Sequence, residues 1–125
     1  MFQLLLVASG GAVGALLRFI LGNILKFYLL HSFYATLCIN VIGSFFIGYL
    51  ISLGLVRSLS EDFIKYFLII GVLGSFTTFS AFSYEAIELF SSNKIFLFII
   101  YVTLSIILCI VASFLGIYLN KNWLN

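Results

Sequence analysis

The sequence has very few charged residues. Only 8% of its 125 residues are Asp, Glu, Lys or Arg, whereas 64% are hydrophobic. A soluble globular domain carries about 25% charged residues, so this composition excludes that class and indicates a membrane protein with a single domain, residues 1–125. The net charge is only +2 and the basic residues form no cluster, so we expect no nucleic-acid partner.

Cysteine is also scarce. Cys38 and Cys109 lie within apolar runs, where a thiol behaves as a small hydrophobic group, and their spacing suggests neither a disulfide nor a metal site. The first residues lack the positive charge that opens a secretion signal. We therefore expect residues 1–25 to remain as a mature membrane span.

Four apolar runs are long enough to cross a lipid bilayer, at residues 3–24, 33–56, 66–88 and 95–119. The loops between them are too short to hold another domain. The sequence therefore predicts an all-α membrane protein with four transmembrane helices.

The basic residues are evenly divided between the two ends of these spans. Arg57, Lys65 and Lys121 fall at the end where the chain termini lie, and Arg18, Lys26 and Lys94 fall at or toward the other. An excess of Lys and Arg on one side normally directs insertion, and here there is none. The balance predicts insertion in both orientations, and hence an antiparallel homodimer.

The third run has an unusual centre. Residues 71–83 read Gly-Val-Leu-Gly-Ser-Phe-Thr-Thr-Phe-Ser-Ala-Phe-Ser, and Gly, Ser, Thr and Phe form helices less readily than Ala or Leu. We interpret this run as a broken transmembrane helix, because irregular backbone persists in a membrane only where protein covers it or where it lines a wet cavity. The alternative is a continuous helix that packs through its small residues. Carbonyls freed between Gly74 and Thr77 would coordinate a hard cation.

Polar side chains recur along the second and fourth runs. Every fourth residue of part of the second run is polar or small, which predicts a stripe that faces protein or water instead of lipid. The stripe consists of Thr36, Asn40, Ser44 and Gly48. Asn40 lies near the middle and offers both amide donors and an acceptor, although many membrane asparagines only join helices. The fourth run has a similar packing face that carries the hydroxyl groups of Tyr101 and Ser105.

The charges near the spans favour an anion as the transported species. Arg18 stands in the first run and faces either the bundle interior or the lipid headgroups. Glu85 follows the centre of the third run closely enough to face a vestibule, but no carboxylate lies at the centre of any span. Phe79 and Phe82 share one helical face, and aromatic ring edges are positive, although core packing is the commoner role of such a pair. Amide and hydroxyl donors with a fixed positive charge suit an anion better than a cation or a proton.

Three blocks of the sequence resemble the CrcB/Fluc family of fluoride ion channels, and the resemblance extends over nearly the whole chain. The first block contains Gly10-Gly11, Gly14-Ala15 and Arg18-Phe19. The second contains Thr36, Asn40, Gly43-Ser44-Phe45 and Gly48. The third contains Gly71, Gly74, Thr77-Thr78-Phe79-Ser80 and Phe82, and it is the most specific.

The resemblance implies a fluoride-selective channel of the bacterial cytoplasmic membrane, and not an enzyme. It implies an antiparallel, dual-topology homodimer with two narrow pores that export fluoride passively. It also implies a structural sodium ion at the dimer axis, held by carbonyls that map to Gly74 and Thr77. The pore residues expected here are Asn40, Phe79, Phe82, Thr78, Ser80, Tyr101 and Ser105, and Arg18 and Glu85 are expected in other structural or functional roles.

Two positions depart from the family's pattern. Ala35 stands where the family often has Gly, which we interpret as a tolerable change in packing. Ala81 stands where the family often has Thr, which removes one hydroxyl from the expected pore. Either Ser80, Ser83 and a hydroxyl of the fourth span are sufficient, or conduction is slower in this protein.

Two other functions compete with fluoride conduction. A proton-coupled small multidrug transporter also has four short spans and dual topology, but that class resembles a pattern with a glutamate in the first span, where this chain has Arg18. A scaffold subunit without permeation would explain the polar stripes as packing, but it gives no reason for the run Thr77-Thr78-Phe79-Ser80.

Overall fold

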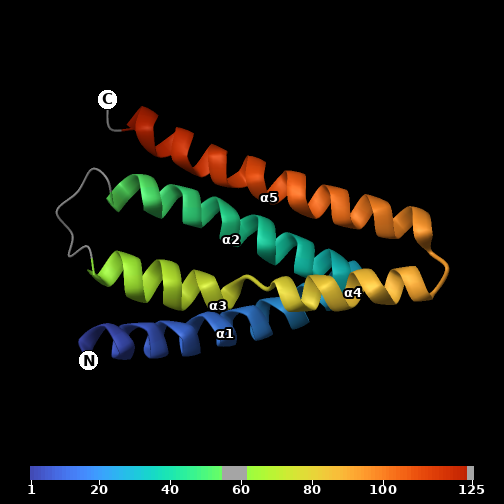
Figure 1. Cartoon of the computed structure of the whole chain (residues 1–125), viewed down its shortest axis with the longest axis horizontal. Coiled ribbons are helices and arrows are strands. Elements are labelled where there is room, and N and C mark those ends of the chain that lie inside the picture. Colours follow the sequence, from blue (N-terminus) through green and yellow to red (C-terminus); the bar gives the residue numbers. More distant parts are fainter. Residues whose placement is uncertain (55–61, 124–125) are drawn as a thin grey trace.

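The structure is a computed structural model that describes residues 1–54 and 62–123, and all regular elements in these ranges are helices (Figure 1). In chain order they are α1 (Phe2–Leu29), α2 (Ser32–Gly54), the π-helix η1 (Phe63–Leu73), α3 (Gly74–Phe76), α4 (Phe79–Ser91) and α5 (Ile95–Trp123). Four segments are long and apolar enough to cross a membrane, namely Phe2–Leu29, Ser32–Leu53, Phe63–Ser91 and Ile95–Asn120. The prediction of an all-α protein with four membrane-crossing helices is confirmed.

The helices extend beyond the predicted spans. α1 continues to Leu29 instead of ending at residue 24, and a left-handed Leu30 (φ 66°) then stops it. η1 begins at Phe63 and α4 ends at Ser91, each three residues beyond the predicted bound. A charged residue near a helix end does not disturb the backbone hydrogen bonds. Helix bounds that are predicted from charge-free runs are therefore shorter than the helices themselves. The predicted end of the second span at residue 56, and Arg57, lie outside the described residues, as does the side chain of Lys121.

The beginning of α1 lies against η1 through glycines. A Cβ atom at Gly10 would meet the backbone of Phe67, and one at Gly14 would meet the backbone of Val72. These glycines of the first sequence block therefore let two helix backbones approach closely, as small residues do between membrane helices.

α2 and α5 pack along most of their lengths, as Figure 1 shows. A Cβ at Gly48 would meet the backbone of Ser113, and the Ser113 hydroxyl donates to the Ser44 carbonyl at 2.9 Å. Tyr101 and Ser105 on the facing side of α5 are buried. The polar stripes of the second and fourth spans thus contribute to helix packing.

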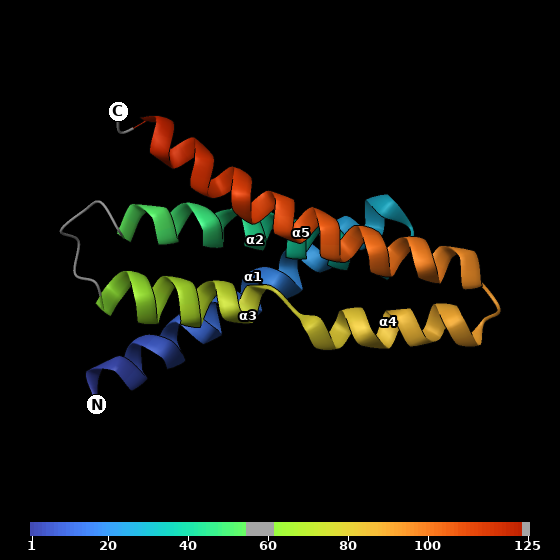
Figure 2. The ribbon, with the colours of Figure 1, turned by 45° about the horizontal axis from the view of Figure 1, so that its top comes forward.

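Helical backbone stops at Phe76 and starts again at Phe79. The two residues between, Thr77 (φ −78°, ψ 153°) and Thr78 (φ −146°, ψ 119°), are extended, and we refer to them as the interruption. Figure 2 shows that α4 is displaced from the line of η1 and α3. The unwound backbone predicted between Gly74 and Thr77 is wrong for Gly74–Phe76, which are helical, and the Thr77 N–H still donates to the Leu73 carbonyl at 3.0 Å.

Candidate functional site

Asn40 of α2 pairs with the backbone of the interruption. Its Oδ1 atom accepts a hydrogen bond from the Thr78 N–H at 2.8 Å, and its Nδ2 atom donates to the Thr78 carbonyl at 3.1 Å. Buried backbone groups require partners, and one side chain here supplies partners for both polar groups of an extended residue. A primary amide has two N–H groups, so Asn40 retains one donor beyond this pairing.

At the interruption, two backbone amides that would bond to carbonyls in a continuous helix have other hydrogen-bond partners. In a continuous α-helix the Thr78 N–H would bond to the Gly74 carbonyl, and the Ala81 N–H would bond to the Thr77 carbonyl. Here Thr78 donates to Asn40, and Ala81 donates to the Thr78 Oγ1 atom at 3.1 Å, which caps the start of α4. The carbonyls of Gly74 and Thr77 therefore lack the amides that a continuous helix would give them.

A cavity of about 320 Å³ lies beside the interruption, and we call it the amide cavity. Five of the predicted pore residues line it, together with apolar side chains of α5. The five are Asn40, Thr78, Phe79, Phe82 and Ser105. Residues that are far apart in sequence thus meet around one space.

The two phenylalanines of the amide cavity differ in burial. Phe82 is 8% exposed, whereas Phe79 is 76% exposed, although their ring centroids lie only 5.2 Å apart. Phe82 belongs to a core cluster of α2, α4 and α5, where its ring lies 5.3 Å from that of Tyr101. Core packing therefore explains Phe82 within one chain, but it does not explain Phe79.

Two of the predicted hydroxyl residues differ in their surroundings. The Ser105 hydroxyl is buried and has no hydrogen-bond partner among the described residues, although Ser105 lines the amide cavity. The Ser80 hydroxyl is exposed, lies 3.1 Å from the Thr78 hydroxyl and does not line that cavity. Of these two, Ser105 is therefore the one whose buried hydroxyl has unused hydrogen-bonding capacity beside Asn40.

Tyr101 belongs to a different cluster of polar side chains, which the sequence did not predict. The buried carboxylate of Glu85 accepts a hydrogen bond from the Thr36 hydroxyl at 2.9 Å and another from the Tyr101 hydroxyl at 2.7 Å. These three side chains join α2, α4 and α5. The signal in the sequence was the position of Thr36 one turn before Asn40 on the polar stripe, but nothing local indicated its partner.

Arg18 faces protein. It is half-buried and lines a second cavity, of about 210 Å³, together with Thr36 and Thr78. Its Nε atom is buried without a hydrogen-bond partner among the described residues. Of the two orientations that the sequence left open, the structure favours the bundle interior.

Comparison with known proteins places this site in a family. The family described as CrcB-like protein, Camphor Resistance (CrcB), matches residues 5–117. The chain belongs to the CrcB-like family. The resemblance that the sequence blocks indicated is therefore confirmed over nearly the whole length.

Several relatives of this CrcB-like protein are named fluoride-specific ion channel FluC. One from Campylobacter hominis is 42% identical over 122 residues, which cover 96% of each chain. One from Agrobacterium fabrum is 38% identical over 123 residues, 98% of each chain, and one from Campylobacter jejuni is 40% identical over 119 residues, 94% of this chain and 97% of the relative. The family is thus one of ion channels and not of enzymes, and this chain is a multi-pass bacterial membrane protein.

Proposed function

We propose that this chain conducts fluoride passively across the membrane, and that it exports fluoride from the cytoplasm. The observation that carries the proposal is the amide cavity, where Asn40 keeps one N–H donor beside the unpartnered hydroxyl residue Ser105. A small anion that leaves water must replace its hydration with donors of this kind. Relatives of similar length are named for fluoride, which agrees with this chemistry.

The walls of the amide cavity favour an anion. None of the described residues that line it is acidic, so no fixed negative charge opposes a fluoride ion there. Apolar side chains such as Ile106 and Ile110 lower the local dielectric constant and strengthen each donor contact. The ring edges of Phe79 and Phe82 are positive and add a weak attraction.

We propose that Phe63–Ser91 acts as a broken third transmembrane helix with the interruption at its centre. Asn40 holds that break open, because its amide gives Thr78 the partners that helical winding would otherwise supply. The break therefore needs no water or lipid to satisfy Thr78, which makes irregular backbone tolerable at that depth.

We also propose that two copies assemble as an antiparallel homodimer with two pores. Phe79 is largely exposed beside the amide cavity, so a second copy would complete the wall that this chain leaves open. Gly74 is exposed, and a Cβ there would meet nothing nearer than the Ile69 carbonyl at 3.6 Å, so its own chain does not require a glycine. Close approach of a second backbone would require one. The even division of basic residues allows both orientations.

The carbonyls of Gly74 and Thr77 fit a structural sodium ion. Their helical donors are diverted to Asn40 and to Thr78, and backbone carbonyls are the hard oxygen ligands that such a cation takes. Two chains would together offer four of these oxygens. When bound, sodium supplies a fixed positive charge between the two pores, which favours anions in both.

Efflux from proteoliposomes tests the proposed function. Purified protein is reconstituted into vesicles loaded with equal concentrations of fluoride and chloride, and the two anions are followed with ion-selective electrodes. We expect rapid release of fluoride, little release of chloride and no dependence on a proton gradient. Release that needs a proton gradient would indicate a carrier, and release of neither anion would leave only the scaffold function.

A further inference from the structure

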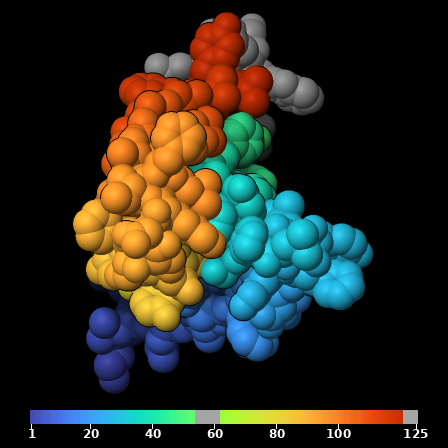
Figure 3. Space-filling view, turned by 90° about the vertical axis from the view of Figure 1, so that its right-hand side faces the viewer, coloured from blue at the N-terminus to red at the C-terminus, as the bar shows by residue number. Residues whose placement is uncertain are grey.

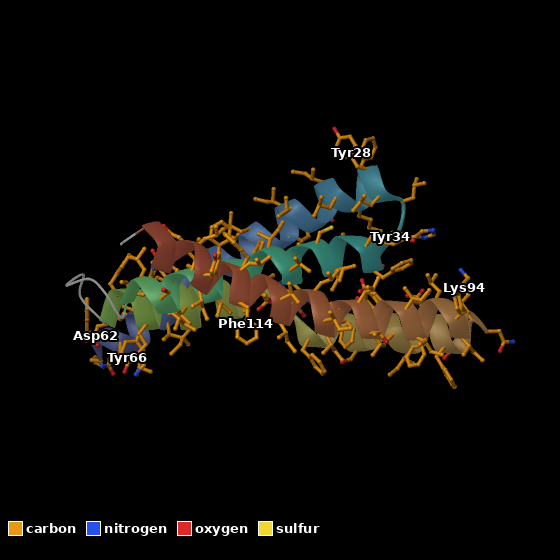
Figure 4. All side chains as sticks on the ribbon, turned by 90° about the horizontal axis from the view of Figure 1, so that it is seen from above. Tyr28, Tyr34, Asp62, Tyr66, Lys94 and Phe114 are labelled. Atoms are coloured by element: carbon orange, nitrogen blue, oxygen red, sulfur yellow. The ribbon has the colours of Figure 1, made fainter. Side chains whose placement is uncertain are left out.

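α2 is the central helix of the chain, and it contacts every other helix of the described residues. In Figure 4 Tyr34, near the start of α2, lies between Tyr28 of α1 and Lys94, which follows α4. Figure 3 views the molecule from this end and shows the start of α2 between the end of α1 and the α4–α5 turn. α2 is therefore placed to hold the interruption from one side.

Gly43 of α2 lies against the side chain of Thr77. Gly43 is buried, and a Cβ atom there would clash with the Thr77 Cγ2 atom and would lie 3.2 Å from the Phe76 Cδ1 atom. At Gly10 and Gly48, by contrast, an added Cβ would first meet the backbone of a neighbouring helix. The space that the missing side chain of Gly43 leaves, which we call the Gly43 notch, is thus occupied by a methyl group of the interruption.

Thr77 cannot rotate out of this notch without losing a hydrogen bond. Its hydroxyl donates to the Leu73 carbonyl at 2.9 Å, and its N–H donates to the same carbonyl at 3.0 Å. The methyl and hydroxyl groups of threonine are both attached to Cβ, so a change in χ1 moves the two together. The Gly43 notch and the Leu73 carbonyl therefore fix one rotamer of Thr77.

Asn40 fixes the other end of the same peptide group. The Thr78 N–H donates to the Asn40 Oδ1 atom at 2.8 Å, and the peptide bond between Thr77 and Thr78 is trans. In a trans peptide the C=O and N–H groups lie in one plane and point in opposite directions, so the Thr77 carbonyl points away from Asn40. Asn40 and Gly43 lie on one face of α2, one turn apart, and jointly hold this peptide plane.

We propose that Gly43 is a positioning residue that, with Asn40, sets the direction of the Thr77 carbonyl. The proposal rests on the proposed function, in which that carbonyl is a ligand of the structural sodium ion. A binding group has to be held close to its productive geometry by the residues that pack around it. A side chain at this position would displace Thr77 and its carbonyl, although Gly43 does not itself line the amide cavity.

A pair of substitutions that exchanges one methyl group tests this role. Gly43→Ala puts a methyl group into the notch, and we expect it to slow fluoride efflux from proteoliposomes about 10-fold or more. Thr77→Ser removes the Cγ2 methyl and keeps the hydroxyl, so it makes room for the added group. We expect Thr77→Ser alone to slow efflux about 2-fold to 3-fold. The double variant of Gly43→Ala with Thr77→Ser should conduct at the rate of Thr77→Ser.

Gly48→Ala is the matched control. It adds the same methyl group to the same helix, where the group would meet the backbone of Ser113 on α5. Thr77→Ser should restore nothing that Gly48→Ala loses, because Thr77 does not contribute to that contact. If Thr77→Ser fails to restore Gly43→Ala, or restores Gly48→Ala to the same extent, Gly43 does not position Thr77 and the proposal is refuted.

The dependence of dimer stability on sodium separates positioning from packing. In Gly43→Ala the sodium concentration that gives half of the maximal thermal stabilisation should rise about 10-fold or more, and Thr77→Ser should reverse this rise. In Gly48→Ala the loss of thermal stability should be the same at every sodium concentration. The same uniform loss in Gly43→Ala would assign Gly43 to packing alone and refute the proposal.

The outcomes distinguish this proposal from the proposed function. If the wild type releases no fluoride but sodium stabilises its dimer, conduction fails, and the sodium titration still decides the role of Gly43. If the wild type conducts but sodium does not stabilise the dimer, the sodium site and the role of Gly43 toward it both fail. If Gly43→Ala does not assemble, size-exclusion chromatography of the double variant decides, since Thr77→Ser should restore assembly and its failure to do so refutes the proposal.

Discussion

Replacement of Asn40 by aspartate turns the amide nitrogen Nδ2 into an oxygen. This change removes both hydrogen-bond donors of the side chain. One carboxylate oxygen can still accept the hydrogen bond from the Thr78 N–H, which Oδ1 now accepts at 2.8 Å. The other oxygen would face the Thr78 carbonyl, to which Nδ2 now donates at 3.1 Å, so two acceptors would oppose each other. The side chain also loses the second N–H, which is the donor that we assign to fluoride.

The expected loss is large in conduction and small in stability. A like charge about 4 Å from the ion costs about 4 kcal/mol at an effective dielectric constant of about 20. That energy alone corresponds to a fall of roughly a thousand-fold in occupancy of the site. The unsatisfied Thr78 carbonyl costs about 1–3 kcal/mol of folding free energy, which lowers thermal stability without preventing assembly.

The assay is fluoride efflux from proteoliposomes, with assembly measured by size-exclusion chromatography. Asn93→Asp is the matched control, because it makes the same substitution in the α4–α5 turn, where Asn93 lines neither the amide cavity nor the second cavity. We expect Asn40→Asp to reduce efflux to the background leak and Asn93→Asp to stay within about 3-fold of the wild type. Asn40→Asp efflux near the wild-type rate would show that the anion does not pass Asn40.

Three further predictions address topology, sodium and the buried carboxylate. Two lysines added after Asn125 should direct all copies into one orientation and abolish efflux. Co-expression of a copy biased toward the opposite orientation should restore efflux. If the wild-type protein is labelled from one side of the membrane only, dual topology is contradicted. Long incubation with a large organic cation in place of sodium should slow efflux and weaken the dimer, and no change in either after verified sodium depletion would leave Gly74 and Thr77 as packing residues. Tyr101→Phe removes one hydrogen-bond donor to Glu85 and should lower the free energy of unfolding by about 1–3 kcal/mol. Tyr84→Phe, on the exposed face of α4, should not lower it. Equal thermal stability of the two variants would refute the structural role of the Tyr101 hydrogen bond.

The amino-acid sequence alone determined the class of protein and its spans. Hydropathy acts locally, because a run of apolar residues has to leave water whatever its neighbours are, so four membrane-crossing segments were readable without any contact information. The polar stripe of the second span also predicted correctly a helix face that packs against protein. The run from Gly71 to Phe82 was specific enough to indicate the family.

The tertiary structure decided which residue pairs with which. Whether Thr78 is helical depends on Asn40, a residue 38 positions earlier, because the hydrogen bonds from Asn40 stabilise the extended backbone of Thr78. For this reason the interruption falls at Thr77 and Thr78, and the weak helix-forming tendency of Gly74 did not locate it.

The same dependence on distant partners separates residues that look alike in sequence. Phe79 and Phe82 are equivalent by helical spacing, yet only Phe82 meets a ring of α5. Glu85 and Glu88 are one turn apart on α4, yet only Glu85 finds hydroxyl donors on two other helices and is buried. Burial of a polar or aromatic side chain depends on what the other helices place opposite it, and that is decided only when the helices pack.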